Sequence, residues 1–184
     1  RTFIVDTVSP QTIVQIGDPR FGTFVRPNTP ITVRSEDDVL LIGDGLGLGV
    51  STLTLSIPGS PVETLQNIST SNVLARIISL SGLPDGPAGL SFFAEDRAGN
   101  MEMVKTFGLV VDSLGPDVQL VPSRDLIRDG PILFATSSDS FTFSAIDAHS
   151  GVREFRYQVN GGSITLFGAP IRFLHEGRFT LTFF

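Results

Sequence analysis

The 184-residue sequence contains no cysteine and no tryptophan, and Lys105 is its only lysine. Without cysteine there are no disulfides, no zinc sites built on thiolates and no thiol nucleophiles. With a net charge of −6 and one lysine, the chain lacks a basic stripe that could neutralise a phosphate backbone. Nucleic acid is therefore not an expected partner. No apolar run approaches the roughly 20 residues of a membrane-spanning helix, so we expect no membrane insertion in this segment.

The residues that are abundant favour β-structure. The chain has 19 glycines, 12 prolines and 15 phenylalanines beside many valines, isoleucines and threonines, a mixture typical of short strands joined by turns. A hydrophobic fraction of 41% with 17% charged residues indicates a compact fold rather than disorder. No segment shows a sustained 3.6-residue apolar period, so we expect at most a single helical turn. The expected fold class is all-β.

Two stretches about 100 residues apart are similar, which makes an internal repeat the first hypothesis. The segment Phe92–Asn100 reads Phe-Phe-Ala-Glu-Asp-Arg-Ala-Gly-Asn, and a weaker copy of its approach closes the chain at Leu181–Phe184. The junction Val5–Pro10 recurs at Val111–Pro116. Because the chain stops where a second Ala-x-Asp-x-Ala-Gly-Asn should begin, we expect it to be a window of a longer array of similar domains.

The expected strands share alternating apolar and polar residues or a high content of β-branched and aromatic residues. They are residues 1–6, 12–16, 31–37, 50–57, 73–80, 90–94, 107–111, 118–121, 141–147, 152–159, 171–174 and 179–184. In this interpretation residues 1–8 are the terminal strand and linker of a preceding repeat. Residues 9–112 form a first domain, and residues 113–184 form a second domain that lacks its last strand.

Four motifs, in the order in which a known family of repeats has them, give the chain a resemblance to that family. They are Val-Asp-x-x-x-Pro at both junctions, Thr-Pro-Ile-Thr-Val-x-Ser-x-Asp at Thr29–Asp37, Ser-Gly-Val-x-x-x-x-Tyr-x-Val-x-Gly-Gly at Ser150–Gly162, and Ala-x-Asp-x-Ala-Gly-Asn at Ala94–Asn100. Nearly the whole chain resembles the bacterial and archaeal immunoglobulin-like tandem repeats of large exported surface proteins, of the adhesin or stalk type. The resemblance implies tandem immunoglobulin-like β-sandwiches, an extracellular or cell-surface location, and a role as spacer, stalk or adhesive module.

The sequence carries no catalytic signature, and we expect no enzyme activity. A hydrolytic triad needs a histidine base, and His149 and His175 both lie in expected turns without a Gly-x-Ser-x-Gly elbow. The glycine run at Gly43–Gly49 lacks the spacing and the Lys-Ser/Thr of a phosphate-binding loop, and it leads into a strand.

A glycan-binding surface has little sequence support. Sugar recognition by a sandwich usually uses exposed flat aromatic side chains, whereas Tyr157 is predicted on a core face. The phenylalanines fall mostly at alternating strand positions, which is typical of core filling. Asn67-Ile68-Ser69 fits the glycosylation sequon, a pattern that often arises by chance.

Acidic residues form the remaining constellation. In an immunoglobulin-like sandwich, the loops beside the incoming linker would gather one set, and the junction between the units would gather another. The first set is Asp6, Asp37, Asp96 and Asn100, with Asp38 or Asp44 as further members. The second set is Asp112, Asp117 and Asp147. Such hard oxygen ligands hold Ca²⁺, and calcium at junctions would stiffen an array. The alternative is turn chemistry, because Asp and Asn side chains also bond backbone N–H groups two residues on.

These expectations favour a structural function: a non-enzymatic repeat module of an extracellular stalk, filament or adhesin. One alternative is an accessory glycan-binding or spacer domain of a secreted enzyme. Another is a filament subunit that polymerises by strand complementation, with residues 1–6 of one copy taking the place of the missing strand in another. The expected partners are accordingly neighbouring repeats, copies of the same chain, a surface receptor or a glycan.

Overall fold

The computed structural model describes residues 2–3, 5–37, 47–69 and 71–184, and over these ranges the chain is all-β without a helix. It divides into two compact units, Arg1–Leu114 and Gly115–Phe184. The strands of the first unit are β1 (Gln11–Ile16), β2 (Arg20–Phe21), β3 (Phe24–Val25), β4 (Ile31–Glu36), β5 (Val50–Ser56), β6 (Glu63–Gln66), β7 (Val73–Ile78), β8 (Gly86–Asp96) and β9 (Lys105–Val111). Those of the second are β10 (Asp117–Pro122), β11 (Ile127–Asp129), β12 (Ile132–Phe134), β13 (Phe141–Ile146), β14 (Arg156–Val159), β15 (Thr165–Leu166) and β16 (Leu181–Phe183). No membrane-crossing helix occurs in the described ranges.

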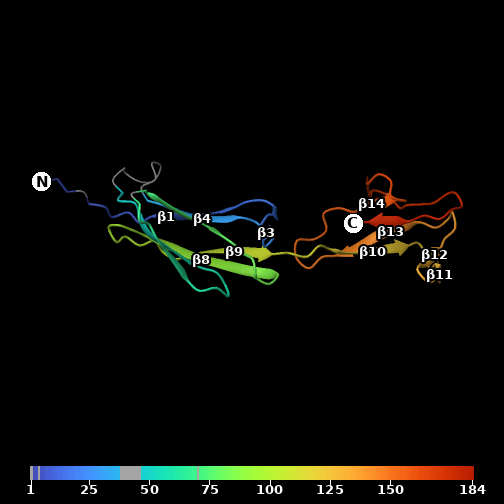
Figure 1. The fold of residues 1–184 in the computed structure, drawn as a ribbon, viewed down its shortest axis with the longest axis horizontal. Helices are drawn as coiled ribbons and strands as arrows, with labels where there is room; N and C mark the ends of the chain where they lie inside the picture. Colours follow the sequence, from blue (N-terminus) through green and yellow to red (C-terminus); the bar gives the residue numbers. More distant parts are fainter. Residues whose placement is uncertain (1, 4, 38–46, 70) are drawn as a thin grey trace. The chain divides into compact units, whose positions relative to one another are not determined.

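The first unit encloses one core between two sheets. A three-stranded sheet has the order β1-β4-β7, and a six-stranded sheet has the order β2-β3-β9-β8-β5-β6. β1 and β4 form one layer and β8 and β9 the other (Figure 1). Alternate side chains of β4 and β8 are buried, as a strand with one face toward a core requires. This arrangement is that of a β-sandwich.

Inward-facing side chains of both sheets in the first unit are completely buried at several positions. Fully buried residues from both sheets include Ile31, Val33, Leu53, Ala94 and Val111, each 0% exposed. The core therefore contains side chains from strands up to 80 residues apart in the sequence, and their packing holds the two sheets together.

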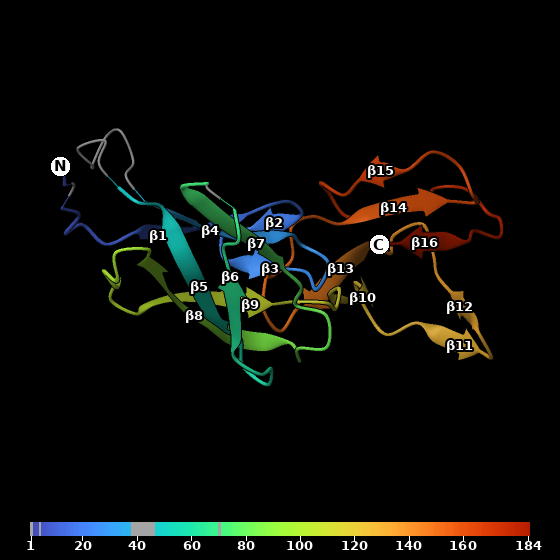
Figure 2. The same ribbon diagram turned by 60° about the vertical axis from the view of Figure 1, so that its left-hand side comes forward.

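The second unit has smaller sheets: β10-β13, the hairpin β11-β12, and β15-β14-β16 (Figure 2). Its core is aromatic. Phe141, Phe143 and Ile171 are buried, and Phe143 packs within 6.1 Å, centroid to centroid, of four other aromatic rings. These partners are only partly buried. The prediction that phenylalanines fill the core therefore holds for these residues, and Tyr157 packs there as expected.

The ladder β10–β13 repeats the register of the ladder β1–β4. In both six-residue pairs, the first residue of one strand lies opposite the last residue of the other: Gln11 opposite Glu36, and Asp117 opposite Ile146. Both ladders are antiparallel, and both second strands carry the alternation that the sequence predicts.

A second pair of ladders also corresponds. Leu55 of β5 lies opposite Phe92 of β8, and Tyr157 of β14 lies opposite Phe183 of β16. The sequence Leu-Ser-Phe-Phe at Leu90–Phe93 is matched by Leu-Thr-Phe-Phe at the end of the chain. β8 and β16 are thus equivalent strands by sequence and by pairing.

Several expected strands differ in the structure. The strand expected at residues 1–6 is wrong for the described residues of that range, which have no strand structure. The strand expected at 171–174 is reduced to one bridge between Phe141 and Ile171, and that at 152–159 to β14. In contrast, β2, β3, β6, β11, β12 and β15 were not expected. These strands are two to four residues long, too short to show a local period, and most of them pair with a strand close in the sequence, as β2 does with β3 and β11 with β12.

Candidate functional site

Three aspartates from distant parts of the sequence meet at one end of the first unit. Asp37 follows β4, Asp96 ends β8, and Asp6 precedes β1. One carboxylate oxygen of each lies within 4.8 Å of the others. Asp37 and Asp96 are buried, at 1% and 2% exposure, and Asp6 is half-buried. The structure therefore brings together three residues of the first predicted set.

The fourth residue of that set, Asn100, lies beside Asp96 and Asp6 but donates hydrogen bonds to them. Its backbone N–H donates to Asp96 Oδ1 at 2.8 Å, and its Nδ2 donates to Asp96 Oδ2 at 2.7 Å. Nδ2 also donates to the backbone oxygen of Asp6 at 3.1 Å. Asp96 and Asn100 thus close the turn after β8 and tie it to the incoming linker. The turn chemistry considered as an alternative is present at this position.

Backbone N–H groups hold the other two carboxylates. Gly49 donates to Asp37 Oδ2 at 2.7 Å, and Leu48 donates to Asp6 Oδ2 at 3.1 Å. Val8 donates to Asp6 Oδ1 at 3.1 Å. The chain leading into β5 therefore runs along the cluster and orients two of its side chains.

Arg97 fixes this chain segment from the other side. Its Nη1 donates to the Leu48 oxygen at 2.7 Å, its backbone N–H donates to the Gly49 oxygen at 3.1 Å, and its Nη2 donates to the Ser69 oxygen. Gly49 has a φ of +85°, and a Cβ there would lie 2.6 Å from Arg97 Nη1. Glycine is favoured here because the positive φ strains any other residue and an added Cβ would push against the Arg97 guanidinium. The sequence analysis did not identify Arg97, although it lies inside the repeated motif.

The chemistry of the cluster suits a hard cation. Three carboxylates held close together concentrate negative charge, and carboxylate oxygens are preferred ligands of Ca²⁺. Asp6, Asp37 and Asp96 are the residues that would hold the ion. Its chemical contribution would be to neutralise their charges and to join the linker to both sheets, since one ligand comes from each of these three parts.

The second predicted set is divided between the two units. Asp112 follows β9 in the first unit, where its backbone N–H donates to the Val25 oxygen at 2.8 Å. Asp147 belongs to the second unit, and its Oδ1 accepts from the N–H groups of His149 at 3.0 Å and Gly151 at 2.7 Å. Asp117 begins β10. A shared junction site for the three therefore stays a prediction. Asp38 and Asp44 lie outside the described residues.

The remaining residues singled out from the sequence occupy turns. Asn67 donates from Nδ2 to the oxygens of Val50 at 2.8 Å and Ser71 at 2.9 Å, so its amide group is used within the fold. His149 belongs to the turn organised by Asp147, and His175 is exposed in a bend. The two histidines thus belong to local turns of the second unit, and Ser69 of the sequon accepts a hydrogen bond from Arg97.

A buried carboxylate of the first unit helps to connect β1 with β9. Glu102 is 6% exposed, its Oε1 accepts from the Thr12 N–H at 2.8 Å, and it pairs with Lys105. Lys105 Nζ also donates to the Thr12 oxygen at 3.0 Å. The only lysine of the chain therefore helps to connect β1 with β9, a role that its sequence position did not reveal.

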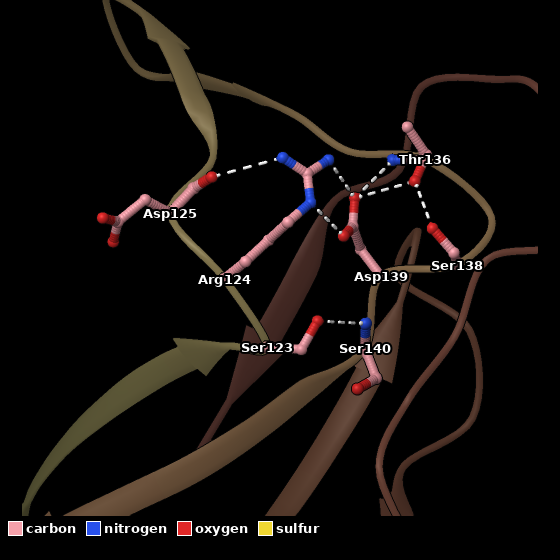
Figure 3. A network of polar contacts seen from close by, with 7 residues as sticks. All are labelled: Ser123, Arg124, Asp125, Thr136, Ser138, Asp139 and Ser140. Carbon is pink, nitrogen blue, oxygen red and sulfur yellow. Dashed lines mark hydrogen bonds and ion pairs between the residues drawn. The ribbon is translucent and has the colours of Figure 1, made fainter.

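A second polar network, also not predicted, organises the second unit (Figure 3). The Arg124 guanidinium faces the Asp139 carboxylate, with Nε to Oδ1 at 2.6 Å and Nη2 to Oδ2 at 2.8 Å. The Thr136 N–H adds a bond to Oδ2 at 2.7 Å. The hydrogen bonds from Arg124, and then that from Thr136, lower the pKa of Asp139 to about 2. The network joins the segment after β10 to the segment before β13.

Comparison with known proteins gives little beyond this geometry. No family model matches the chain, and no curated protein matches it at a significant level. Among solved structures, the chain is similar to the crystal structure of dimeric latent PorU from Porphyromonas gingivalis, with 15% sequence identity and a TM-score of 0.40. The match covers 97% of this chain and 17% of the PorU chain, so the sequence spans about a sixth of that protein's length. A likeness of this size carries no argument about function.

Proposed function

We propose that the chain is a non-enzymatic structural module of an extracellular or cell-surface stalk, filament or adhesin, built from tandem immunoglobulin-like β-sandwiches. The supporting observation is the path of the chain through the first unit. Asp6, on the incoming linker, lies beside Asp96 at the end of β8, whereas Val111, at the end of β9, pairs with Gly86 at the start of β8. β8 is 11 residues long, which corresponds to about 34 Å. The chain therefore enters this unit at one end and leaves it at the other.

This path suits a module that transmits tension. A pull on the two ends runs along the strands, so the hydrogen bonds across the ladders, which lie perpendicular to the strands, are loaded together rather than one by one. β9 is held on both sides, by β8 in an antiparallel ladder and by β3 in a parallel one. At the other end, the Glu102 and Lys105 side chains connect β9 to β1.

Single-molecule force spectroscopy tests the proposal. We expect the first unit, pulled through its own two ends, to unfold in one step that releases about 300 Å of chain, as roughly 100 residues at ~3.5 Å each minus the folded length require. Glu102→Ala should lower the unfolding force by removing one of the two side-chain hydrogen bonds to Thr12 of β1, whereas Glu154→Ala, in the second unit, should leave it unchanged. Unfolding at negligible force, or specific binding on a glycan array, would contradict the structural role and favour an accessory glycan-binding domain.

The immunoglobulin-like, tandem part of the proposal has its support in the repeated registers. The ladders β1–β4 and β10–β13 correspond, as do β5–β8 and β14–β16. Two units that share their pairings and follow each other in one chain suit a repeat array, whose units stack in series.

We also propose that the first unit binds Ca²⁺ through Asp6, Asp37 and Asp96, which would fasten the linker to the sandwich. If the dissociation constant is on the order of 10⁻⁴ M, as in extracellular modules, 10 mM Ca²⁺ adds about 2.7 kcal/mol of stability. For a unit of about 100 residues this raises Tm by about 10–20 °C.

Thermal unfolding in calcium and in excess chelator checks this. The rise in Tm should disappear in Asp96→Asn and persist in Asp147→Asn, whose carboxylate serves a turn of the second unit. An unchanged Tm of the unmodified chain between millimolar Ca²⁺ and chelator would show that the cluster serves only the turn and the linker.

A further inference from the structure

Thr12, Ser35 and Glu102 each bury a polar atom that has no hydrogen-bond partner in the described part of the chain. The atoms are Thr12 Oγ1, Ser35 Oγ and Glu102 Oε2. Thr12 is 3% exposed, Ser35 0% and Glu102 6%, so bulk water does not reach them. A buried hydroxyl or carboxylate oxygen loses its hydration and needs a replacement, which is why such groups in native proteins are almost always paired with protein or ordered water.

The contacts around these residues place them together between the two sheets of the first unit. Thr12 lies directly opposite Ser35 in the ladder of β1 with β4. The Thr12 N–H donates to Glu102 Oε1 at 2.8 Å and Lys105 Nζ donates to the Thr12 oxygen, so both backbone groups of Thr12 point away from β4. Thr12 and Ser35 are therefore a non-hydrogen-bonded pair, in which side chains approach closely. Glu102 is held to the other sheet, since its N–H donates to the Ala94 oxygen of β8 at 2.9 Å.

The core side chains at this position are small. On the buried face of β4, Val33 is followed by Ser35. On the buried face of β8, Phe92 is followed by Ala94. Facing sheets lie about 10 Å apart, a gap that serine and alanine side chains do not span by themselves. The position where Glu102 enters the core therefore suits a ligand no larger than a water molecule or a small ion.

The chemistry of the three atoms decides between these two ligands. Glu102 pairs with Lys105, so its charge is already balanced, and a further cation would leave a net positive charge in a buried place. The hydroxyls of Thr12 and Ser35 each carry a hydrogen that needs an acceptor, which a cation does not supply, whereas Glu102 Oε2 needs a donor. A water molecule can accept from both hydroxyls and donate to the carboxylate, and three such bonds are typical of buried water.

We propose that one water molecule is bound inside the first unit, where it accepts hydrogen bonds from the Thr12 and Ser35 hydroxyls and donates one to Glu102 Oε2. It links the β1–β4 ladder to the segment between β8 and β9, beside the direct bond from the Thr12 N–H to Glu102 Oε1. The site uses none of the aspartates of the proposed calcium site, so either can exist without the other.

Oxygen-17 magnetic relaxation dispersion tests the proposal, because its amplitude measures the water molecules that tumble with the protein and does not depend on the exchange of hydroxyl protons. Thr12→Val with Ser35→Ala removes both hydroxyls at equal or smaller side-chain volume and should lower the amplitude by about one water molecule. Thr32→Val, on the opposite face of β4, is the matched control and should leave the amplitude unchanged. An equal amplitude in the unmodified chain and the double variant would overturn the proposal.

Urea unfolding followed by circular dichroism gives a second test, which the single variants already begin to answer. Thr12→Val and Ser35→Ala should each raise the unfolding equilibrium constant about tenfold, because each removes one partner of the buried water. The double variant should raise it by less than the product of about a hundredfold, since both hydroxyls bind the same water. Effects that multiply in full would show that the two hydroxyls share no ligand, and would refute the site.

Exchange of sodium chloride for choline chloride at equal concentration separates bound water from a bound cation. The Tm of the unmodified chain should be the same in both salts. A lower Tm in choline that disappears in the double variant would show a small cation at this position and overturn the assignment of water. All measurements are made in excess chelator, so their outcome does not depend on the calcium proposal.

Discussion

Gly49→Ala is expected to destabilise the first unit. A side chain at a φ of +85° costs about 1–2 kcal/mol. The new Cβ would lie 2.6 Å from Arg97 Nη1 and 3.1 Å from the Ser71 oxygen, so Arg97 must move and weaken its bond to the Leu48 oxygen. That bond is exposed to water and adds about 1 kcal/mol at most. We expect a total loss of about 1–3 kcal/mol, which lowers Tm by about 5–20 °C.

Gly59→Ala is the matched control, because Gly59 has a φ of +75° but a Cβ added there would meet nothing within 4 Å. It should lose only the conformational part, about 1–2 kcal/mol, and about 5–15 °C. The difference between the two variants isolates the steric contact with Arg97 and the Ser71 oxygen.

Differential scanning calorimetry measures the first unit, and tyrosine fluorescence gives an internal reference. Tyr157 is the only tyrosine and there is no tryptophan, so this signal reports on the second unit alone and should not change. In an Arg97→Ala background, the effect of Gly49→Ala should shrink by about 1 kcal/mol. Equal losses in Gly49→Ala and Gly59→Ala would refute the packing argument around Arg97.

Two further predictions concern the second unit. The pKa of Asp139 is lowered from 3.8 to about 2, so the stability that its carboxylate contributes is complete above pH 3.8 and is lost as the pH falls toward 2. Acid unfolding followed by tyrosine fluorescence should show this loss. Asp139→Asn should be less stable at pH 7 and should lack the acid-dependent step. Phe143→Ala removes the ring around which four aromatic side chains pack and should cost about 3–5 kcal/mol, whereas Phe134→Ala, on an exposed hairpin position, should cost less than about 1 kcal/mol in urea unfolding followed by the same fluorescence.

The strands with a clear two-residue period were predictable within one or two residues. Residues 31–37 and 141–147 became β4 and β13, and 107–111 became part of β9, because alternate burial imposes that period on the sequence. Short strands such as β2 and β15 have no room for a period. They exist because the neighbouring strand, which is close in the sequence, offers hydrogen bonds to two residues, a length at which no period can be recognised.

The candidate site shows the same division. Asp6, Asp37 and Asp96 were expected together from the assumed order of strands in a sandwich, and their oxygens do lie within 4.8 Å. The donors that hold them were not foreseen: Gly49 and Leu48 on one side and Arg97 on the other. Nor was the ion pair of Arg124 with Asp139. Each of these contacts joins residues 12 to 49 positions apart, and their geometry depends on how the connecting loops fold.

The sequence by itself determined that the chain is all-β and that similar segments recur about 100 residues apart, because alternation, turn residues and motif order are local properties of the chain. The tertiary structure decided which strands are neighbours, that Phe3 and Val5 remain in solvent, and that β16 has one free edge in the described part of the chain. These features depend on strand pairing and burial, because hydrogen bonds and apolar contacts between residues far apart in the sequence determine them, and composition does not record those contacts.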